Sequence, residues 1–216
     1  GRLMALDAKT GKPANSFGDN GELNLRLGVA DKFPNATYYV SSAPAIYRDL
    51  IILGPRLSER AADGKGPAGD VRAFDARTGK LVWAFHTLPR PGEPGYETWG
   101  PDFWKDGMGP STWGGITVDE DRGMVFVPTG QPGSTTQPGA NLFGDCVLAL
   151  DAATGKLRWY YQMIHHDVWD YDTGAAPAFV DVVRNGQRIP AVVELTKPGL
   201  LFILDRTTGQ PVFGVE

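Results

Sequence analysis

The sequence has little of several features that would place it in other classes of protein. Cysteine occurs once among the 216 residues, at Cys146, which excludes a disulfide within the chain. No apolar run approaches the ~20 residues of a membrane-spanning helix, and no stretch keeps a helical period of about 3.6 residues for two turns. The formal net charge is −4 with no basic stripe, so nucleic acid is not expected as a partner.

Glycine and proline are abundant instead, with 28 and 17 residues that lie in clusters between short apolar runs. This distribution is typical of an all-β domain with many turns. The expected strands are 50–53, 71–75, 81–86, 115–118, 124–129, 147–151, 157–162, 178–183, 190–196 and 200–205. Long Gly/Pro-rich loops cover 54–70, 87–112 and 128–145, and long loops on one rim of a rigid scaffold are where binding sites are usually built.

One pattern, Ala-x-Asp-x-x-Thr-Gly-Lys-x-x-Trp, occurs twice in full and twice in weaker form. In each copy the Asp carboxylate can accept backbone N–H groups and the Gly supplies the positive φ of a tight turn. The full copies begin at Ala73 and Ala149 and end at Trp83 and Trp159; the weaker ones begin at Ala5 and Ile203, with Asn15 and Phe213 in the Trp position. Repeated aromatic residues of this kind can pack one four-stranded unit against the next. The sequence therefore predicts roughly half of a β-propeller.

The repeat closely resembles the tryptophan-docking motif of the pyrroloquinoline-quinone dehydrogenases, a family of eight-bladed propellers. Segments 111–115, 127–132 and 165–172 strengthen the resemblance, which runs along the whole chain. It implies one partial propeller domain over residues 1–216, truncated at both ends. The octet His165–Asp172 is similar to the membrane-bound glucose dehydrogenase branch, whereas Trp99–Lys105 is similar to the alcohol-oxidising branch.

The resemblance assigns catalysis and cofactor binding to three residues. Asp170 resembles the catalytic base, a carboxylate that takes the hydroxyl proton while hydride passes to the quinone. Trp113 resembles the tryptophan beneath the planar quinone, and Lys197 matches the cation that bonds to the quinone oxygens. The alternatives are a turn aspartate, a core tryptophan and a surface lysine.

The resemblance also implies that four oxygen-bearing side chains hold a metal ion: Glu59, Gln131, Asp170 and Asp172. Hard oxygen donors suit Ca²⁺ or Mg²⁺. Gln131 stands where the alcohol-oxidising pattern carries Asn, one methylene shorter. Asp172 stands where lanthanide-dependent methanol dehydrogenases also place a carboxylate, but sugar-oxidising relatives that use Ca²⁺ or Mg²⁺ carry an acid there too. A lanthanide is therefore the minority hypothesis.

His166 and Trp169, which flank the base, are also expected to contribute to cofactor binding. Adjacent histidines in a strand point to opposite faces, so His165 and His166 are not expected to share one metal ion. Hydrogen bonding that positions Asp170 is the expected role of this pair.

Together these features predict a periplasmic quinoprotein dehydrogenase that oxidises an aldose or a primary alcohol. It would use pyrroloquinoline quinone and Ca²⁺ and pass electrons to a quinone or a cytochrome c, with any membrane attachment made by segments outside this chain. One alternative is a non-catalytic propeller scaffold of the outer-membrane-assembly type, which shares the docking repeat. Another is an enzyme whose cofactor site is incomplete within these residues. The joint presence of Trp113, Asp170 and Lys197 at strand ends favours the enzyme.

Overall fold

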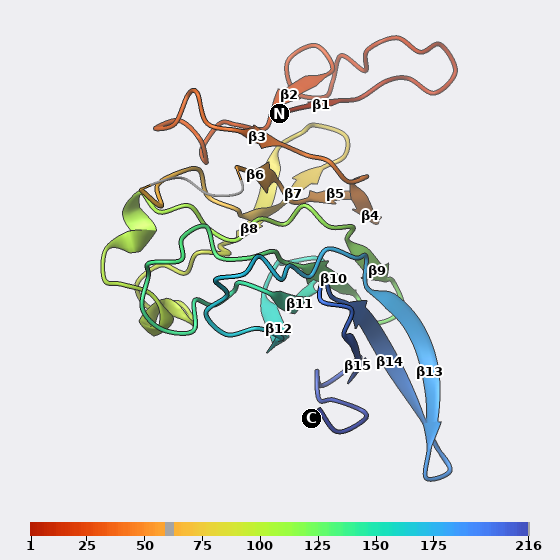
Figure 1. Ribbon diagram of the computed structural model, residues 1–216. Coiled ribbons are helices and arrows are strands. Elements are labelled where there is room, and N and C mark those ends of the chain that lie inside the picture. Colours follow the sequence, from red (N-terminus) through yellow and green to blue (C-terminus); the bar gives the residue numbers. More distant parts are fainter. Residues whose placement is uncertain (59–62, 216) are drawn as a thin grey trace.

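The computed structural model describes residues 1–58 and 63–215, and its regular structure is almost entirely β. Two short 3₁₀ helices, η1 (Tyr96–Thr98) and η2 (Phe103–Lys105), interrupt the longest loop. Among the described residues, no helix has the length and apolar character needed to cross a membrane. The antiparallel sheets fan out one after another along the chain, from the N-terminal segment to the β13–β14 hairpin (Figure 1).

In each of the three larger sheets the strands are arranged in the order of the sequence, with only β6, between β5 and β7, pairing elsewhere, which is the arrangement of a propeller blade. The first has the order β4 (Ala45–Tyr47), β5 (Leu50–Leu53), β7 (Val71–Asp75) and β8 (Leu81–Phe85). The second comprises β9 (Thr117–Asp119), β10 (Met124–Pro128), β11 (Cys146–Asp151) and β12 (Leu157–Gln162). The third comprises β13 (Ala178–Arg184), β14 (Gln187–Leu195) and β15 (Leu201–Asp205). The predicted all-β partial propeller is confirmed.

Two small two-stranded sheets complete the regular structure among the described residues. They pair β1 (Arg2–Met4) with β2 (Glu22–Asn24) and β3 (Tyr38–Tyr39) with β6 (Arg56–Leu57). The sequence indicated a strand at 3–7, which overlaps β1, but it did not predict β2, β3, β4 or β6, because two or three residues do not establish a hydrophobic period.

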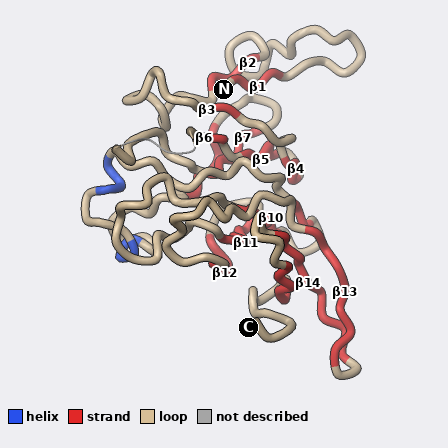
Figure 2. The backbone as a smooth tube through the Cα atoms, viewed as in Figure 1, coloured by secondary structure: helices blue, strands red, loops and turns tan. Residues whose placement is uncertain are grey.

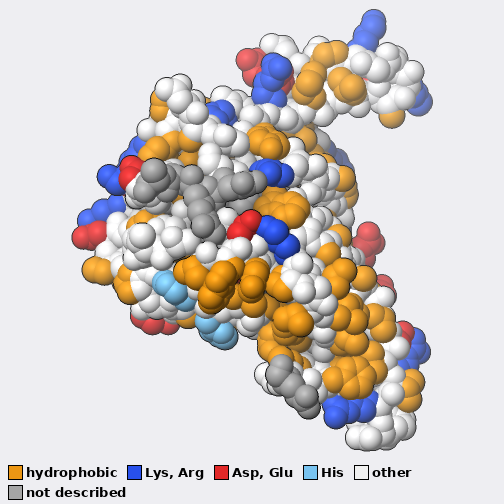
Figure 3. All heavy atoms as spheres, in the orientation of Figure 1, with side chains coloured by type: hydrophobic (Ala, Val, Ile, Leu, Met, Phe, Trp, Pro, Cys, Tyr) orange, Lys and Arg blue, Asp and Glu red, His pale blue; other side chains and the backbone are white. Residues whose placement is uncertain are grey.

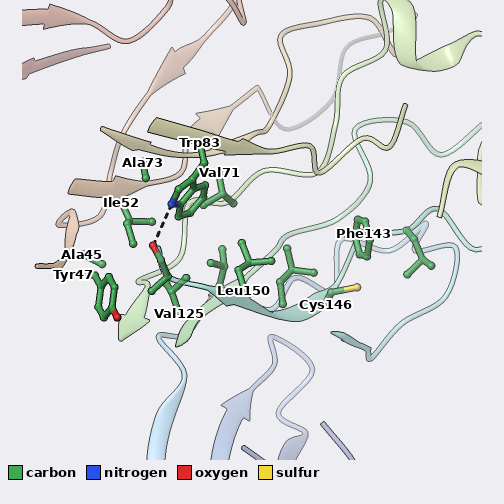
Figure 4. Packing of buried hydrophobic residues seen from close by; sticks show 14 residues of the cluster. Ala45, Tyr47, Ile52, Val71, Ala73, Trp83, Val125, Phe143, Cys146 and Leu150 are labelled. Carbon is green, nitrogen blue, oxygen red and sulfur yellow. Dashed lines mark hydrogen bonds between the residues drawn. The ribbon is translucent and has the colours of Figure 1, made fainter. Parts of the chain in front are cut away.

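The core lies between neighbouring sheets, where apolar side chains from facing strands interdigitate. Ile52 and Trp83 of the first sheet pack against Leu148 and Leu150 of the second (Figure 4). Phe126 and Trp159 of the second sheet pack in turn against Val192 and Phe202 of the third. The first and third sheets therefore each bury a face against the second, which is covered on both faces, and burial of this apolar area is the main force that holds the sheets together.

The repeated turns follow the hydrogen bonding expected from the sequence. Asp75 Oδ1 accepts the N–H groups of Arg77 and Thr78 at 3.1 and 2.8 Å and the Thr78 hydroxyl at 2.7 Å. Gly79 then adopts a φ of 71°, which only glycine takes readily. Aspartates 7, 151 and 205 begin equivalent turns.

Each repeat tryptophan docks on the turn of the following sheet. Trp83 Nε1 donates to the Ala152 carbonyl at 3.1 Å, and a Cβ on Gly155 would come within 2.5 Å of its ring. Trp159 does the same with the Arg206 carbonyl, at 3.1 Å, and with Gly209. The glycine thus serves the turn and also leaves room for the indole ring.

The first repeat uses a different aromatic residue. Its Trp position holds Asn15, but it is Phe17 that packs on Gly79, where a Cβ would lie 3.4 Å from the ring. The Phe17 N–H donates to the Ala14 carbonyl at 2.9 Å, so a turn delays the aromatic residue by two positions. The Gly18 N–H closes the contact by donating to the Thr78 carbonyl at 3.0 Å.

The two ends of the sheets therefore differ. One end, the docking rim, carries the repeated turns after Asp75, Asp151 and Asp205. Because neighbouring strands are antiparallel, the opposite end, the loop rim, carries the connections 54–70, 86–116, 129–145 and 163–177. Figure 2 shows these long loops gathered together with the two short helices.

Candidate functional site

A cavity of about 460 Å³ opens at the loop rim, lined by residues from five separate connections. It brings together Trp113, Gln131, Asp170, Asp172 and Lys197, five of the eight site residues predicted from the sequence. Figure 3 shows acidic and basic side chains meeting in the middle of this face beside hydrophobic side chains. A concave, mostly apolar site with a few convergent polar groups is the usual form of a small-molecule site.

The Trp113 ring forms one wall of the cavity and is held by close backbone contacts. A Cβ on Gly174 would lie 2.4 Å from the ring, and a Cβ on Gly130 would lie 3.1 Å from Nε1. The main-chain carbonyl of Trp113 accepts the hydroxyls of Ser41 and Ser42. The two glycines therefore let the backbone approach an aromatic surface that is fixed in place.

Asp170 and Lys197 form an ion pair at the cavity. Lys197 Nζ donates to Asp170 Oδ2 and lies 3.5 Å from Asp172 Oδ2. The hydrogen bond to Asp170 is the main reason why the pKa of Lys197 is raised. The Asp170 side chain is 35% exposed, so it lies within reach of a molecule that enters from solvent.

Asp172 lies deeper than Asp170 and connects three segments of the site. Its Oδ1 accepts the Gln131 N–H at 2.9 Å, and its carbonyl accepts the Lys197 N–H at 3.0 Å. Burial raises the pKa of Asp172, opposed by the Gln131 N–H and reinforced by the negative charge of Asp170. A cation in the cavity would relieve this unfavourable charge pairing.

The loop around Asp170 is shaped by Asp167, which the sequence analysis missed. The Asp167 carboxylate accepts the N–H groups of Trp169, Asp170 and Tyr171 at 2.7, 3.2 and 2.7 Å. Asp170 adopts a left-handed φ of 69° within this turn. An aspartate three residues before such a position is a typical turn signal, so the sequence contained the information.

The remaining predicted residues lie elsewhere. His166 Nδ1 contacts the Gly139 carbonyl at 3.0 Å and Asn141 Oδ1 at 2.8 Å, outside the cavity lining. Trp169 is 64% exposed and stacks on Tyr171 with ring centroids 5.6 Å apart, also outside the lining. Their predicted cofactor contacts stay predictions. Glu59 lies outside the described residues.

The sequence analysis also missed a second acid, on which the charges of cavity residues act. Asp145 is fully buried, and neither carboxylate oxygen has a hydrogen-bond partner among the described residues. Burial, followed by the charges of Asp167, Asp172 and Asp170, raises its pKa to about 9. No local sequence pattern marks this residue, because its burial depends on the packing of several loops.

The arrangement is compatible with a planar cofactor and a hard cation. Glycine backbone against Trp113 leaves an aromatic wall open to the cavity, and Lys197 supplies a positive charge beside it. Asp170, Asp172 and Gln131 supply oxygen donors to the cavity, and the charges of Asp170 and Asp172 act on the partnerless Asp145 carboxyl. Within residues 1–58 and 63–215, no three His, Cys, Asp or Glu side chains converge closely enough to hold a metal ion.

Comparisons with known proteins concern the chain as a whole. The family model for the glucose/ethanol/alcohol dehydrogenase β-propeller domain matches residues 1–216. Quinate/shikimate dehydrogenase (quinone) of Acinetobacter baylyi is 37% identical over 98% of the chain, which spans 26% of that protein. Quinoprotein glucose dehydrogenase of Gluconobacter oxydans is 36% identical over 98% of the chain, which spans 27% of it.

Among solved structures, a europium-containing methanol dehydrogenase superposes with a TM-score of 0.81. It is 28% identical over 99% of the chain, which spans 38% of that structure. The chain thus corresponds to between a quarter and two fifths of the length of these relatives. By the match over its whole length, this chain belongs to the family of pyrroloquinoline-quinone-dependent dehydrogenase β-propellers.

Proposed function

We propose that this chain supplies the aromatic floor, the base and most of the metal ligands of a quinoprotein dehydrogenase that oxidises a primary alcohol or an aldose. The observation that carries the proposal is the convergence of Trp113, Asp170, Asp172 and Lys197 on one cavity from three different connections. Trp113 precedes Asp170 by 57 residues and Asp172 by 59 residues in the sequence. Their convergence on one cavity is therefore a product of the fold.

In this proposal each side chain has one role. When bound, pyrroloquinoline quinone would supply a hydride acceptor and the metal ion a Lewis acid. Asp170 accepts the substrate hydroxyl proton, and Lys197 holds that carboxylate in place until the cavity is filled. Trp113 orients the planar cofactor, and Asp172 and Gln131, with Glu59, hold the cation.

The substrate class is proposed from the relatives, whose names include quinate, glucose and methanol. All three compounds carry a hydroxyl group on a carbon that can give up hydride. Electron transfer to a quinone or a cytochrome c and a periplasmic location belong to the same proposal. The rival, a propeller scaffold without catalysis, needs the docking turns but has no use for a lysine–aspartate pair facing a cavity.

The test is reconstitution of the protein that carries this chain. The metal-stripped apo-protein is incubated with pyrroloquinoline quinone and either Ca²⁺ or La³⁺, and dye-linked oxidation is followed over a panel of aldoses, polyols and primary alcohols. We expect activity that depends on both additions. Quinone binding without turnover on any substrate, or no quinone binding at all, would support the scaffold.

A further inference from the structure

Two carboxyl groups in the described part of the chain are buried without hydrogen-bond partners, Asp145 and Glu194. An ionised carboxyl in such a place costs several kcal/mol unless a counter-charge is present. Natural proteins keep few such groups, and each one calls for an explanation. The charged groups around these two carboxyls differ, and this difference assigns a role to Asp145.

Main-chain hydrogen bonds fix Asp145 beside the segments that carry the candidate metal ligands. It precedes β11, and its N–H donates to the Gly130 carbonyl at 3.0 Å, next to Gln131. Its own carbonyl accepts the Met163 N–H at 2.8 Å, at the start of the loop that carries Asp170. The residue therefore joins the two segments that present oxygen donors to the cavity.

The charges around Asp145 are unbalanced. Asp167, Asp172 and Asp170 act on its carboxyl as negative neighbours, and Lys197 is the positive group that opposes them. Asp167 has its carboxylate engaged by three N–H groups, whereas Asp145 has none. A fully buried acid beside three other acids and one lysine is a place where an added cation would be strongly favoured.

Glu194 provides the contrast. It is 1% exposed and burial raises its pKa to about 8, an increase that the Ala175 N–H opposes. Among the described residues, no neighbouring carboxylate contributes to this increase. Lack of a partner by itself therefore does not mark a cation site, and the difference lies in the acidic surroundings of Asp145.

We propose that Asp145 is a further charged residue of the metal site, acting from beside the segments of Gln131 and Asp172, and that it favours a trivalent cation over a divalent one. This inference rests on the proposed function and adds, to the ligand set implied by the family resemblance, a charge that does not itself coordinate the ion. Attraction to a fixed negative charge grows in proportion to the charge of the ion, most strongly in a buried, low-dielectric place. Asp145 is a positioning residue because the acids do not converge into a closed ligand set.

The experiment uses the metal-stripped protein that carries this chain and measures binding of Tb³⁺ by its luminescence, which a nearby tryptophan such as Trp113 sensitises. Ca²⁺ binding is measured by competition. We expect Asp145→Asn to weaken Tb³⁺ binding by ~10-fold or more and Ca²⁺ binding less, by about fivefold when Tb³⁺ loses tenfold, because the lost attraction scales with ionic charge. Glu194→Gln, the matched control, should leave both affinities unchanged.

Thermal unfolding separates this role from a merely structural one. Asp145→Asn should not lower the melting temperature of the apo-protein, but it should reduce the increase that Tb³⁺ produces. An equal loss for both ions, or the same change in Glu194→Gln, would overturn the inference. If the variant does not fold, the wild type decides, because a protein that prefers Tb³⁺ to Ca²⁺ by less than tenfold contradicts it. A wild type that binds neither ion would instead contradict the proposed function.

Discussion

The docking rim and the loop rim use the same kind of tryptophan–glycine contact for different purposes. Each sets a tryptophan against a glycine that has no room for a side chain, Trp83 on Gly155 and Trp113 on Gly174. At the docking rim the indole N–H bonds to a carbonyl and the ring is buried, so the contact joins two sheets. At the loop rim the ring lines a cavity. The same pair of residues thus serves stability at one rim and binding at the other.

The largest expected effect lies at the loop rim. Asp170→Asn keeps the shape of the side chain but cannot accept a proton, so kcat should fall at least ~10²-fold while cofactor binding is retained. Asp205→Asn, in a docking turn where Asp205 Oδ1 accepts the N–H groups of Thr207 and Thr208, should leave turnover intact. Near-normal kcat in Asp170→Asn would remove this residue from the role of base.

Replacing Gly174 or Gly155 with alanine tests the two rims separately. In Gly174→Ala the new Cβ would lie 2.4 Å from the Trp113 ring, so the ring must move and quinone binding should weaken at least ~10-fold. In Gly155→Ala a φ of 70° and a Cβ 2.5 Å from Trp83 should cost ~1–3 kcal/mol of unfolding free energy, with unchanged quinone affinity. Quinone titration of both variants measures the affinity, and urea unfolding measures the stability. If each variant changed both quantities alike, the assignment of stability to the docking rim and of binding to the loop rim would be wrong.

Removing an indole N–H at the docking rim should have a moderate effect. Trp159→Phe leaves the Arg206 carbonyl without its 3.1 Å hydrogen bond and should cost ~1–3 kcal/mol in urea unfolding. Trp113→Phe should affect quinone affinity more than the free energy of unfolding, because this ring lines the cavity. The reverse ranking of the two variants would show that Trp113 is a core residue.

The rims should also respond to pH in opposite ways. At the docking rim, burial alone would raise the pKa of Asp151, but hydrogen bonds from Arg158 and Thr154 lower it, so its stabilisation is lost only as pH falls below ~4. Near the loop rim, Glu194 holds a proton up to a pKa of about 8, against 4.5 in the unfolded chain. Its unfolded form therefore releases the proton first, and stability falls as pH rises from ~4.5 to ~8.

Glu194→Gln should consequently reduce the loss of stability between pH 5 and pH 8, by a few degrees in melting temperature. Arg158→Ala, which removes a partner of Asp151, should leave that interval unchanged. Parallel pH curves for wild type and Glu194→Gln would show that this acid keeps a normal pKa.

The two rims also differ in how much the sequence predicts. The docking turns are local: Asp75, Thr78 and Gly79 make their bonds within five residues, so the motif appears in the sequence as a repeat. Trp113, Asp170 and Lys197 were predicted by resemblance, and the structure brings them together. Asp145 could not be predicted, because the loops that bury it are far apart in sequence. Phe17 was missed because a turn shifts it two residues beyond the repeat position.

The docking contacts have a direction, and this affects how the chain folds as it is made. Trp83 bonds to a carbonyl 69 residues later and Trp159 to one 47 residues later. At ~5–20 residues per second of synthesis, Trp83 waits roughly 3–14 s for its docking turn after it has itself been added. During that interval the open face of each new sheet is available to chaperones or to other nascent chains. In each contact the earlier sheet supplies the indole and the later turn supplies the carbonyl. The sheets should therefore close one by one from the N-terminus, and each step is completed when the next docking turn has been made.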